Sequence, residues 1–272
     1  MPGDNPGSGS GAVEKPVAIV VRMAEHPRTA FPAAALDHLA GPTPGRVLAL
    51  EGPATVAIAL SHRGHRVFGV DRDPSVARRF GHSGPIPRVT ARTEALPFDP
   101  CQFDAVVAHQ SFHRFNPRPA LSEMARVLRP GGHAAISYLV RDDTVPWVRR
   151  LAALLRSVDP DAMRGDYGDS TAAALLSSKY FPEHDTRTFR VWVPMSRREL
   201  LAMVGSQPRI VAAGADRRAR LLHLVGDLFD DTTGGLESVR LPYQLKVWRG
   251  FVDHDELTAS IDVASDALVI RF

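Results

Sequence analysis

Short apolar runs alternate with amphipathic stretches through the first half of the chain. Residues 103–110, F-D-A-V-V-A-H-Q, are apolar on both faces, which is typical of a central strand in a parallel sheet. Residues 118–128, R-P-A-L-S-E-M-A-R-V-L, repeat their apolar positions on one face of a helix, and Pro130, Gly131 and Gly132 predict its end. The same reasoning predicts strands at 46–50, 66–71, 88–92 and 133–140, and helices at 31–40, 56–64 and 73–80. This alternation predicts an α/β fold with a doubly wound, mostly parallel sheet.

The second half of the chain has a different rhythm. Three stretches carry helical patterns, at 145–155, 196–204 and 216–229. Two others are typical of strands, at 189–193 and 241–250. We expect these strands to close the far edge of the same sheet and the helices to form a lid. The predicted organisation is a disordered, Gly/Pro/Ser-rich arm at 1–14, a single domain at 15–251 with its core at 31–140 and its lid and edge strands at 141–251, and a C-terminal extension at 252–272.

The composition argues against several classes of protein. The net charge is +3 and no Lys/Arg run resembles a nucleic-acid-binding tail, so we expect no nucleic-acid partner. No apolar run approaches the ~20 residues of a membrane helix and no signal-peptide pattern is present, so we expect a cytoplasmic protein without a membrane partner. The single cysteine, Cys101, excludes an internal disulfide and is expected to be a small, partly buried apolar residue. Nothing in the sequence indicates the oligomeric state.

Residues 49–60, A-L-E-G-P-A-T-V-A-I-A-L, stand where a nucleotide-binding protein turns from its first strand into its first helix. They hold one glycine where such turns usually hold two or three. Around them, the strings R-V-L-A-L, G-H-R-V-F-G-V-D, E-A-L-P-F-D, F-D-A-V-V and A-R-V-L-R-P-G-G resemble the class I S-adenosylmethionine-dependent methyltransferases, specifically the small-molecule subgroup called type 11. The resemblance covers residues 31–140. It implies a Rossmann-like sheet of seven strands with the last one antiparallel, S-adenosylmethionine as cofactor and a small molecule as substrate.

The resemblance places part of the cofactor against this loop. In the family the first strand ends in an acidic residue, and the glycines that follow let the backbone approach the cofactor. If the loop has the usual length, Ala49 stands at the acidic position and residues such as Glu51 and Pro53 replace glycines. If it is one residue shorter, Glu51 falls near the acidic position, where it can meet the cofactor's ammonium group, and Gly52 and Ala54 fall near two glycines. Both alignments stay open.

Other positions of the resemblance carry over one by one. Asp71 closes the second strand, where the family's acid accepts hydrogen bonds from the ribose hydroxyls, and the alternative role for it is to begin the next helix. Arg92 replaces an acid near the adenine, so it can stack on a purine or bind a phosphate but cannot accept from the adenine amino group. The residues assigned to the cofactor are Ala49, Glu51, Gly52, Asp71, Arg72, Arg92, Thr93 and His109.

The residues near the expected chemistry are less diagnostic. His113 follows the strand that lies beside the transferred methyl group in the family, so it is a weak candidate for a general base, and a histidine packed in a loop is the favoured alternative. Its spacing from His109 does not predict a metal site, because both lie in or beside a loop and a third ligand is absent. Methyl transfer is an in-line displacement that positioning and desolvation can achieve without a dedicated base. Weak candidates for the substrate pocket are Phe115, Tyr138 and Trp147, although aromatic residues at such spacing more often belong to a core.

Three functions are open at this point. The first is an S-adenosylmethionine-dependent methyltransferase acting on a small molecule. The alternative is a pseudoenzyme that retains the fold as a binding or regulatory module, and the fold alone does not separate the two. A nicotinamide oxidoreductase, which would also use Asp71 on a ribose, is least favoured because G-x-G-x-x-G is absent.

Overall fold

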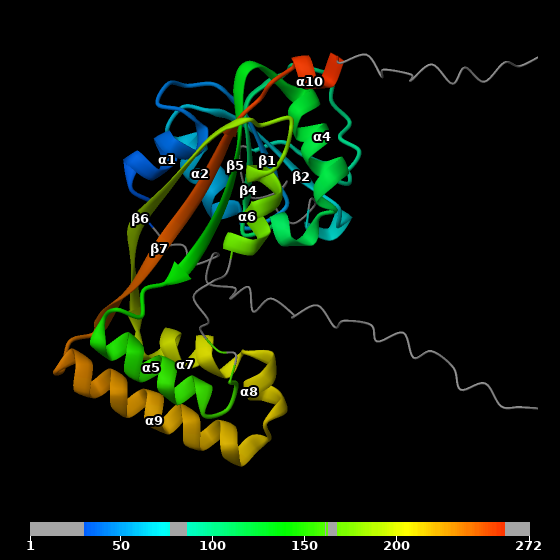
Figure 1. Cartoon of the computed structure of the whole chain (residues 1–272). Coiled ribbons are helices and arrows are strands. Elements are labelled where there is room, and N and C mark those ends of the chain that lie inside the picture. Colours follow the sequence, from blue (N-terminus) through cyan, green and yellow to red (C-terminus); the bar gives the residue numbers. More distant parts are fainter. Residues whose placement is uncertain (1–29, 77–85, 161, 163–167, 259–272) are drawn as a thin grey trace, which may run out of the picture.

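A seven-stranded sheet forms the centre of the computed structural model, which describes residues 30–76, 86–160, 162 and 168–258 (Figure 1). The strands are β1 (Arg46–Leu50), β2 (Arg66–Asp71), β3 (Arg88–Thr90), β4 (Phe103–His109), β5 (Leu128–Arg141), β6 (Glu183–Ser196) and β7 (Ser238–Phe251). Their order is β3-β2-β1-β4-β5-β7-β6. The first five pair in parallel, whereas β7 runs antiparallel to both of its neighbours. The expected α/β fold, a doubly wound and mostly parallel sheet with an antiparallel last strand, is confirmed.

Two apolar clusters lie on opposite faces of this sheet, because alternate residues of each strand point to opposite sides. One cluster contains Val107 of β4 and is covered by α1 (Ala33–Ala40) and α2 (Ala54–His62). The other contains Val106 and is covered by α4 (Pro117–Val127) and α6 (Asp169–Leu176). α4 begins with a proline, whose fixed φ suits the first helical turn. The continuous apolar run of β4 therefore supplies both faces of the core.

A helical lobe lies beyond the sheet, at the ends of three long strands. β5, β6 and β7 have 14 residues each, and at about 3.3 Å per residue they extend for roughly 45 Å. They run past the other strands to α5 (Pro146–Arg156), α7 (Arg197–Gly205), α8 (Pro208–Ala212) and α9 (Ala215–Thr233) (Figure 1). The arrowhead of β5 points towards this lobe, so the carboxyl ends of the parallel strands face it. The lobe occupies the place expected for the lid.

The predicted strand lengths are wrong in this region. β6 begins at Glu183 rather than at residue 189, and its first six residues, E-H-D-T-R-T, are polar. Main-chain pairing with β7 continues along the whole strand to Ser196. Backbone hydrogen bonds therefore stabilise the polar segment as a strand, although its side chains do not alternate between apolar and polar. β5 likewise begins at Leu128 rather than at residue 133, so it includes the Pro-Gly-Gly segment that was predicted to end the preceding helix. Pattern-based boundaries fail here because the pairing partner lies far away in the sequence.

Local signals explain several helix ends, but not every helix. α7 starts with a capping box in which Ser196 and Glu199 bond each other's backbone, and α9 ends at Gly234 in the left-handed conformation. The sequence pattern does not predict α6, α8 or the short α10 (Asp255–Thr258). Cys101 is exposed rather than partly buried, because it lies in the turn before β4 with a φ of +57°. The arm at 1–14, the end of the helix expected at 73–80 and residues 259–272 lie outside the described residues.

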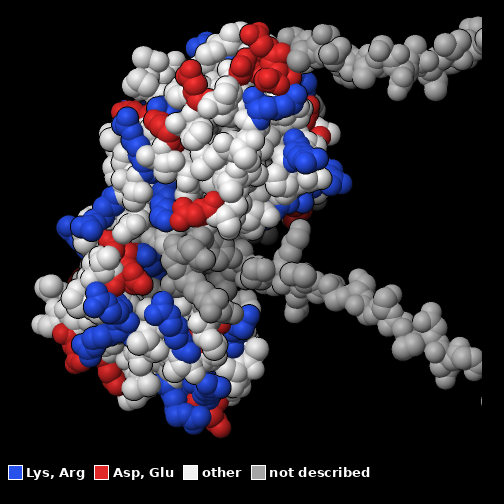
Figure 2. Space-filling model, in the orientation of Figure 1, with Lys and Arg blue, Asp and Glu red and all other residues white. Residues whose placement is uncertain are grey.

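The surface carries charges of both signs. Basic and acidic side chains are interspersed over the face shown in Figure 2, with basic ones more numerous on the helical lobe. Among the residues that the structure describes, no helix combines the length and the apolar character needed to cross a bilayer.

Candidate functional site

The turn from β1 into α2 is built around Gly52. Its φ is +141°, and a Cβ at this position would lie 2.4 Å from the backbone oxygen of His109 at the end of β4. Only glycine permits such a close approach of two chain segments. The preceding Glu51 also has a positive φ, +35°, and its N–H donates to the oxygen of Val70 in β2 at 2.8 Å. The turn is therefore clamped across the carboxyl ends of β1, β2 and β4, where ligands bind in doubly wound sheets.

A pocket lies beside this turn, on the face of the sheet that α1 and α2 cover. It comprises about 300 Å³ of space between the atoms, a volume that includes open solvent. It is lined by Ala49, Leu50, Glu51, Gly52, Pro53, Val56, Ala57, Arg88, Val107 and His109. The structure thus brings Ala49, Glu51, Gly52 and His109 of the expected cofactor set into one pocket.

The carboxylate of Glu51 is buried between two guanidinium groups, and its side chain has 0% exposed surface. Arg72 Nε donates to both carboxylate oxygens at 3.0 and 2.9 Å, and Arg114 Nη2 donates to Oε2 at 2.6 Å. The hydroxyl of Thr93 donates to Oε1 at 3.3 Å. Arg72 also donates to the backbone oxygen of Arg114 at 3.2 Å. These four residues, which we call the Glu51 cluster, tie together the segments that follow β1, β2, β3 and β4.

The Glu51 cluster changes what this carboxylate can offer a ligand. An isolated acid would attract an ammonium group, whereas this one is already paired with two cations. The side chains of Arg72 and Arg114 are 39% and 43% exposed, so their remaining N–H groups reach the surface beside the pocket. The expected contact of Glu51 with a cofactor ammonium stays a prediction. The structure adds that a ligand at this place would meet two guanidinium groups as well as the carboxylate.

Asp71 stands at the end of β2, next to the Glu51 cluster. Its side-chain oxygen Oδ1 accepts a hydrogen bond from the N–H of Asp73 at 2.9 Å, which turns the chain towards the helix that begins at Pro74. Burial raises the pKa of the Asp71 carboxyl group, and the charge of Glu51 adds to this, while the Asp73 N–H, Arg114 and Arg88 oppose it. A buried carboxylate of this kind gains from a partner that donates hydrogen bonds. Both sequence-based roles, hydroxyl acceptor and helix start, are therefore compatible with one side chain.

His109 presents an unpartnered nitrogen at the end of β4. Its Nδ1 lies 2.9 Å from the hydroxyl of Ser137 in β5, and the Phe31 ring packs edge-on against it at 5.8 Å. Its Nε2 is buried and has no hydrogen-bond partner among the described residues. Burial lowers the pKa of His109 to about 3, so the imidazole is neutral at physiological pH. It offers one hydrogen bond at the pocket wall, as donor or acceptor according to its tautomer.

Two buried histidines also make folding sensitive to acid. Burial lowers the pKa of His109 to about 3 and that of His133 to about 4, the latter opposed by a hydrogen bond to the oxygen of Leu39. In the unfolded chain each imidazole takes up a proton as the pH falls through about 6.5, whereas the folded protein keeps it neutral. The free energy of unfolding therefore falls below about pH 6.5, by about 1.4 kcal/mol per pH unit for each histidine, until the folded pKa is reached.

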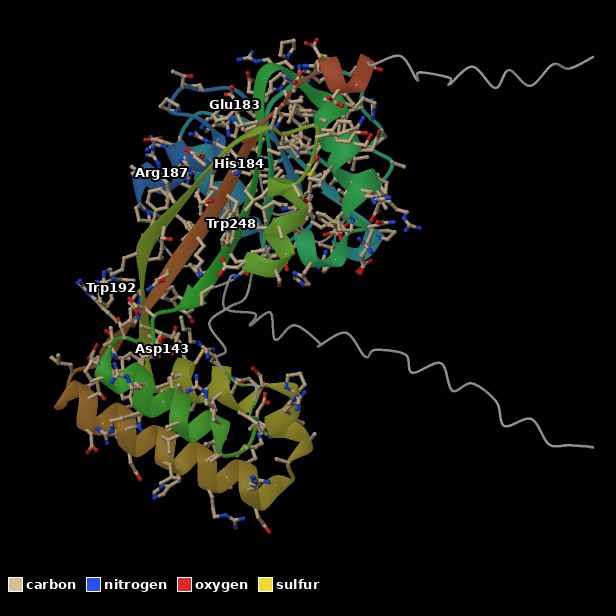
Figure 3. All side chains as sticks on the ribbon, in the orientation of Figure 1. Asp143, Glu183, His184, Arg187, Trp192 and Trp248 are labelled. Carbon is tan, nitrogen blue, oxygen red and sulfur yellow. The ribbon has the colours of Figure 1, made fainter. Side chains whose placement is uncertain are left out.

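Between pH 7 and pH 5, we expect the free energy of unfolding to fall by about 2 kcal/mol less in His109→Asn, and likewise in His133→Asn, than in the wild type. The reason is that the replaced imidazole no longer takes up a proton on unfolding. Urea denaturation at pH 7, 6 and 5 measures the effect. His184→Asn, at an exposed site on β6 that Figure 3 labels, is the control for replacing a histidine. Equal pH dependence in the wild type and both buried-site variants would contradict the expectation.

His113 is engaged with Tyr138 on the other face of the sheet. Its backbone N–H donates to the Tyr138 hydroxyl at 2.9 Å, and its ring Nδ1 lies 3.2 Å from the same oxygen. Burial, helped by the charge of Arg114, lowers the pKa of His113. Phe115 packs with Tyr138 in one apolar cluster, whereas Trp147 packs against the cluster on the opposite face. The structure therefore does not bring the three weak substrate candidates together.

The remaining expected contact, Arg92, does not line the pocket. Its side chain is 74% exposed and pairs with Glu94 at 3.6 Å. Arg114 and Arg88 were not predicted as site residues, because they meet the site through long-range packing and carry no local signal. Ser137, which contacts His109 from a neighbouring strand, was not predicted either. Among the described residues no three His, Cys, Asp or Glu side chains gather as a metal site would require.

Known methyltransferases are similar to this chain over part of its sequence and in their fold. The family model described as a methyltransferase domain matches residues 51–136. Uncharacterized methyltransferases from Mycobacterium bovis and Mycobacterium tuberculosis are each 34% identical over 141 residues, which is 50% of this chain and 57% of the relative. A demethylmenaquinone methyltransferase from Clavibacter sepedonicus is 29% identical over 148 residues, 52% of this chain and 60% of the relative. The chain spans little more than half the length of the curated relatives it matches.

Solved structures show the same architecture over more of the chain. A putative type II methyltransferase from Anaeromyxobacter dehalogenans has a TM-score of 0.64 at 21% identity, covering 82% of this chain and 97% of that one. A putative methyltransferase from an antibiotic biosynthesis pathway of Anabaena variabilis has a TM-score of 0.55 at 18% identity, covering 79% and 95%. The resemblance to the class I S-adenosylmethionine-dependent methyltransferases is confirmed. The chain has their fold, and its residues 51–136 match the model of a methyltransferase domain.

Proposed function

We propose that this protein is an S-adenosylmethionine-dependent methyltransferase that acts on a small molecule. The observation that carries the proposal is the pocket at the carboxyl ends of β1 and β4, most of whose lining residues belong to the matched methyltransferase domain. Its edge is a turn that only glycine allows at Gly52. Asp71 follows on the neighbouring strand, where a carboxylate can accept hydrogen bonds from ribose hydroxyls.

The residues present fit much of the proposed cofactor. Asp71 is 4% exposed and gains from hydroxyl donors, which a ribose supplies. Gly52 lets the turn pack against the end of β4, so that both segments line the same pocket. The Glu51 cluster combines one carboxylate with two guanidinium groups, so it suits the zwitterionic methionine end of the cofactor better than a lone ammonium. In this respect the chain departs from the family's free acid.

The protein's part in such a reaction is mainly to position two molecules. The bound cofactor would supply a methyl group on a sulfonium, and transfer to an aligned nucleophile needs no dedicated base. The neutral imidazole of His109, held by Ser137, offers a fixed hydrogen bond at the end of β4. The side chains of Val107 and Ala49 make the adjoining wall apolar, which helps to exclude water. We infer no general base from His113, whose ring contacts Tyr138.

Isothermal titration calorimetry with S-adenosylmethionine tests the proposal. We expect binding in the micromolar range, weakened about tenfold or more in Asp71→Asn, because the ribose hydroxyls lose a charged acceptor. Asparagine keeps an oxygen for the N–H of Asp73, so the local turn is retained. Glu183→Gln is the matched control, since this acid is exposed at the start of β6, at the end of that strand away from the helical lobe (Figure 3).

Absence of any binding heat at millimolar S-adenosylmethionine, from protein that melts cooperatively, would overturn the proposal. Equal weakening in Asp71→Asn and Glu183→Gln would instead remove Asp71 from the cofactor site. Titration with S-adenosylhomocysteine under the same conditions shows whether the sulfonium charge contributes to affinity.

A further inference from the structure

A guanidinium group that forms no ion pair with an acid of the described residues lies where β5 enters the helical lobe. Arg141 is the last residue of β5. Asp143 follows two residues later, and Figure 3 labels it at the junction between the long strands and the helices. The carboxyl ends of the parallel strands face this junction, so Arg141 stands on the same side of the sheet edge as the proposed methyl-donor pocket.

Arg141 also shares a face of the sheet with that pocket. Alternate residues of a strand point to the same side, so Ser137, Leu139 and Arg141 form one row on β5. Ser137 begins the row by contacting His109 of the pocket wall, and Leu139 packs in the same apolar cluster as Ala49. Four residues of strand separate Ser137 from Arg141, a distance of about 13 Å. The row leads from the pocket to the guanidinium.

The contacts of Arg141 are weak for a charged group. Its Nη2 lies 3.5 Å from the sulfur of Met203 in α7, and the guanidinium is hydrogen-bonded to the side chain of Tyr243 in β7. Its Nε is buried and has no partner among the described residues. No Asp or Glu of the described chain forms an ion pair with it. A thioether and a phenol therefore stand where a buried or half-buried guanidinium usually finds an anion.

Two acids of this region, Asp142 and Asp230, pair with other groups. Asp142, the next residue, accepts from the Thr144 hydroxyl at 2.6 Å and from Arg190 at 3.0 Å. Asp230 on α9 pairs with Arg197 at 3.0 Å. Neither of these acids pairs with Arg141 in the part of the chain that the structure describes. The planar fork of a guanidinium matches a carboxylate or a phosphate in shape as well as in charge.

We propose that Arg141 binds an anionic oxygen group, a carboxylate or a phosphate, on the methyl acceptor. The acceptor would lie along the row from His109 to Arg141, with its anionic end at the helical lobe and its reactive end at the pocket. This inference extends the proposed methyltransferase function, and the identification of the bound molecule as a methyl acceptor rests on that function. The anion site itself rests only on Arg141 and its surroundings, so it can be tested without the cofactor.

Calorimetric titration of the cofactor-free protein with three matched probes provides the test. Octanoate and octyl phosphate carry the two candidate anions, and octanamide is the neutral counterpart of octanoate. We expect the wild type to bind one or both anionic probes at least about tenfold more tightly than octanamide, the effect of one charge-assisted contact. The stronger of the two anions identifies the acceptor group.

Variants at Arg141 assign the preference to this residue. Arg141→Gln should bring the anionic probes down to the affinity of octanamide, and Arg141→Lys should keep part of the preference because the charge remains. Arg198→Gln, at an exposed position of α7, is the matched control and should keep the full preference. Circular dichroism melts check folding, and Arg141→Met, which suits the apolar surroundings of Met203, replaces the glutamine variant if that fails to fold.

The outcomes separate this inference from the proposed function. Equal affinity of the wild type for octanoate, octyl phosphate and octanamide overturns the anion site, and so does an unchanged preference in folded Arg141→Gln or Arg141→Met. Preference for an anion together with no binding of S-adenosylmethionine supports the anion site and overturns only the methyltransferase proposal. Binding of S-adenosylmethionine without any anion preference does the reverse.

Discussion

Replacing Arg72 and Arg114 together by glutamine is expected to lower the free energy of unfolding by about 3–5 kcal/mol, because the Glu51 carboxylate is then buried without a cation. The side chain of Glu51 has 0% exposure, so water cannot take over from the lost partners. Among the described side chains, the Thr93 hydroxyl would remain as a donor to this carboxylate, at 3.3 Å. Urea denaturation monitored by circular dichroism measures the loss.

Adding Glu51→Gln to the double variant should recover most of that loss. The triple variant no longer buries a charge, and the glutamine amide can still meet Thr93 and the introduced glutamines. Arg150→Gln is the control, because its ion pair with Asp231 is 3.5 Å long and exposed on both sides, and such pairs contribute about 0–1 kcal/mol. If the triple variant is less stable than the double one, the cluster stabilises the fold by some means other than neutralising Glu51.

Gly52→Ala is expected to abolish binding of S-adenosylmethionine and to destabilise the protein by more than the ~1–3 kcal/mol that strained backbone alone costs. The new Cβ would lie 2.4 Å from the oxygen of His109, so the ends of β1 and β4 must move apart. The pocket between them, lined by both segments, changes shape as a result. Urea denaturation and calorimetric titration report the two effects.

A second glycine separates backbone strain from the clash. Gly41 has a similar left-handed φ of +96°, but a Cβ there meets nothing within 4 Å. Gly41→Ala should therefore cost only the strain and leave cofactor binding intact. Equal stability losses at the two positions would show that the contact with His109 is not what requires glycine at residue 52.

Much of the fold follows from local pattern, because side-chain periodicity reports which face of an element is buried. The run at 103–110 predicted β4 to within one residue, and 46–50 and 66–71 predicted β1 and β2 at their observed bounds. The alternation of these elements predicted the parallel sheet. The polar start of β6 escaped prediction, because its ladder with β7 joins residues that are far apart in the sequence.

For the site, the sequence by itself determined which residue types stand at the carboxyl ends of the strands. It placed Glu51, Gly52, Asp71 and His109 there, because parallel strands put their ends at one edge of a sheet. Only the tertiary structure decided what each of them contacts. Glu51 meets Arg114, 63 residues away, and His109 meets Ser137, 28 residues away. Partners that distant are chosen by strand order and register, which no local pattern records.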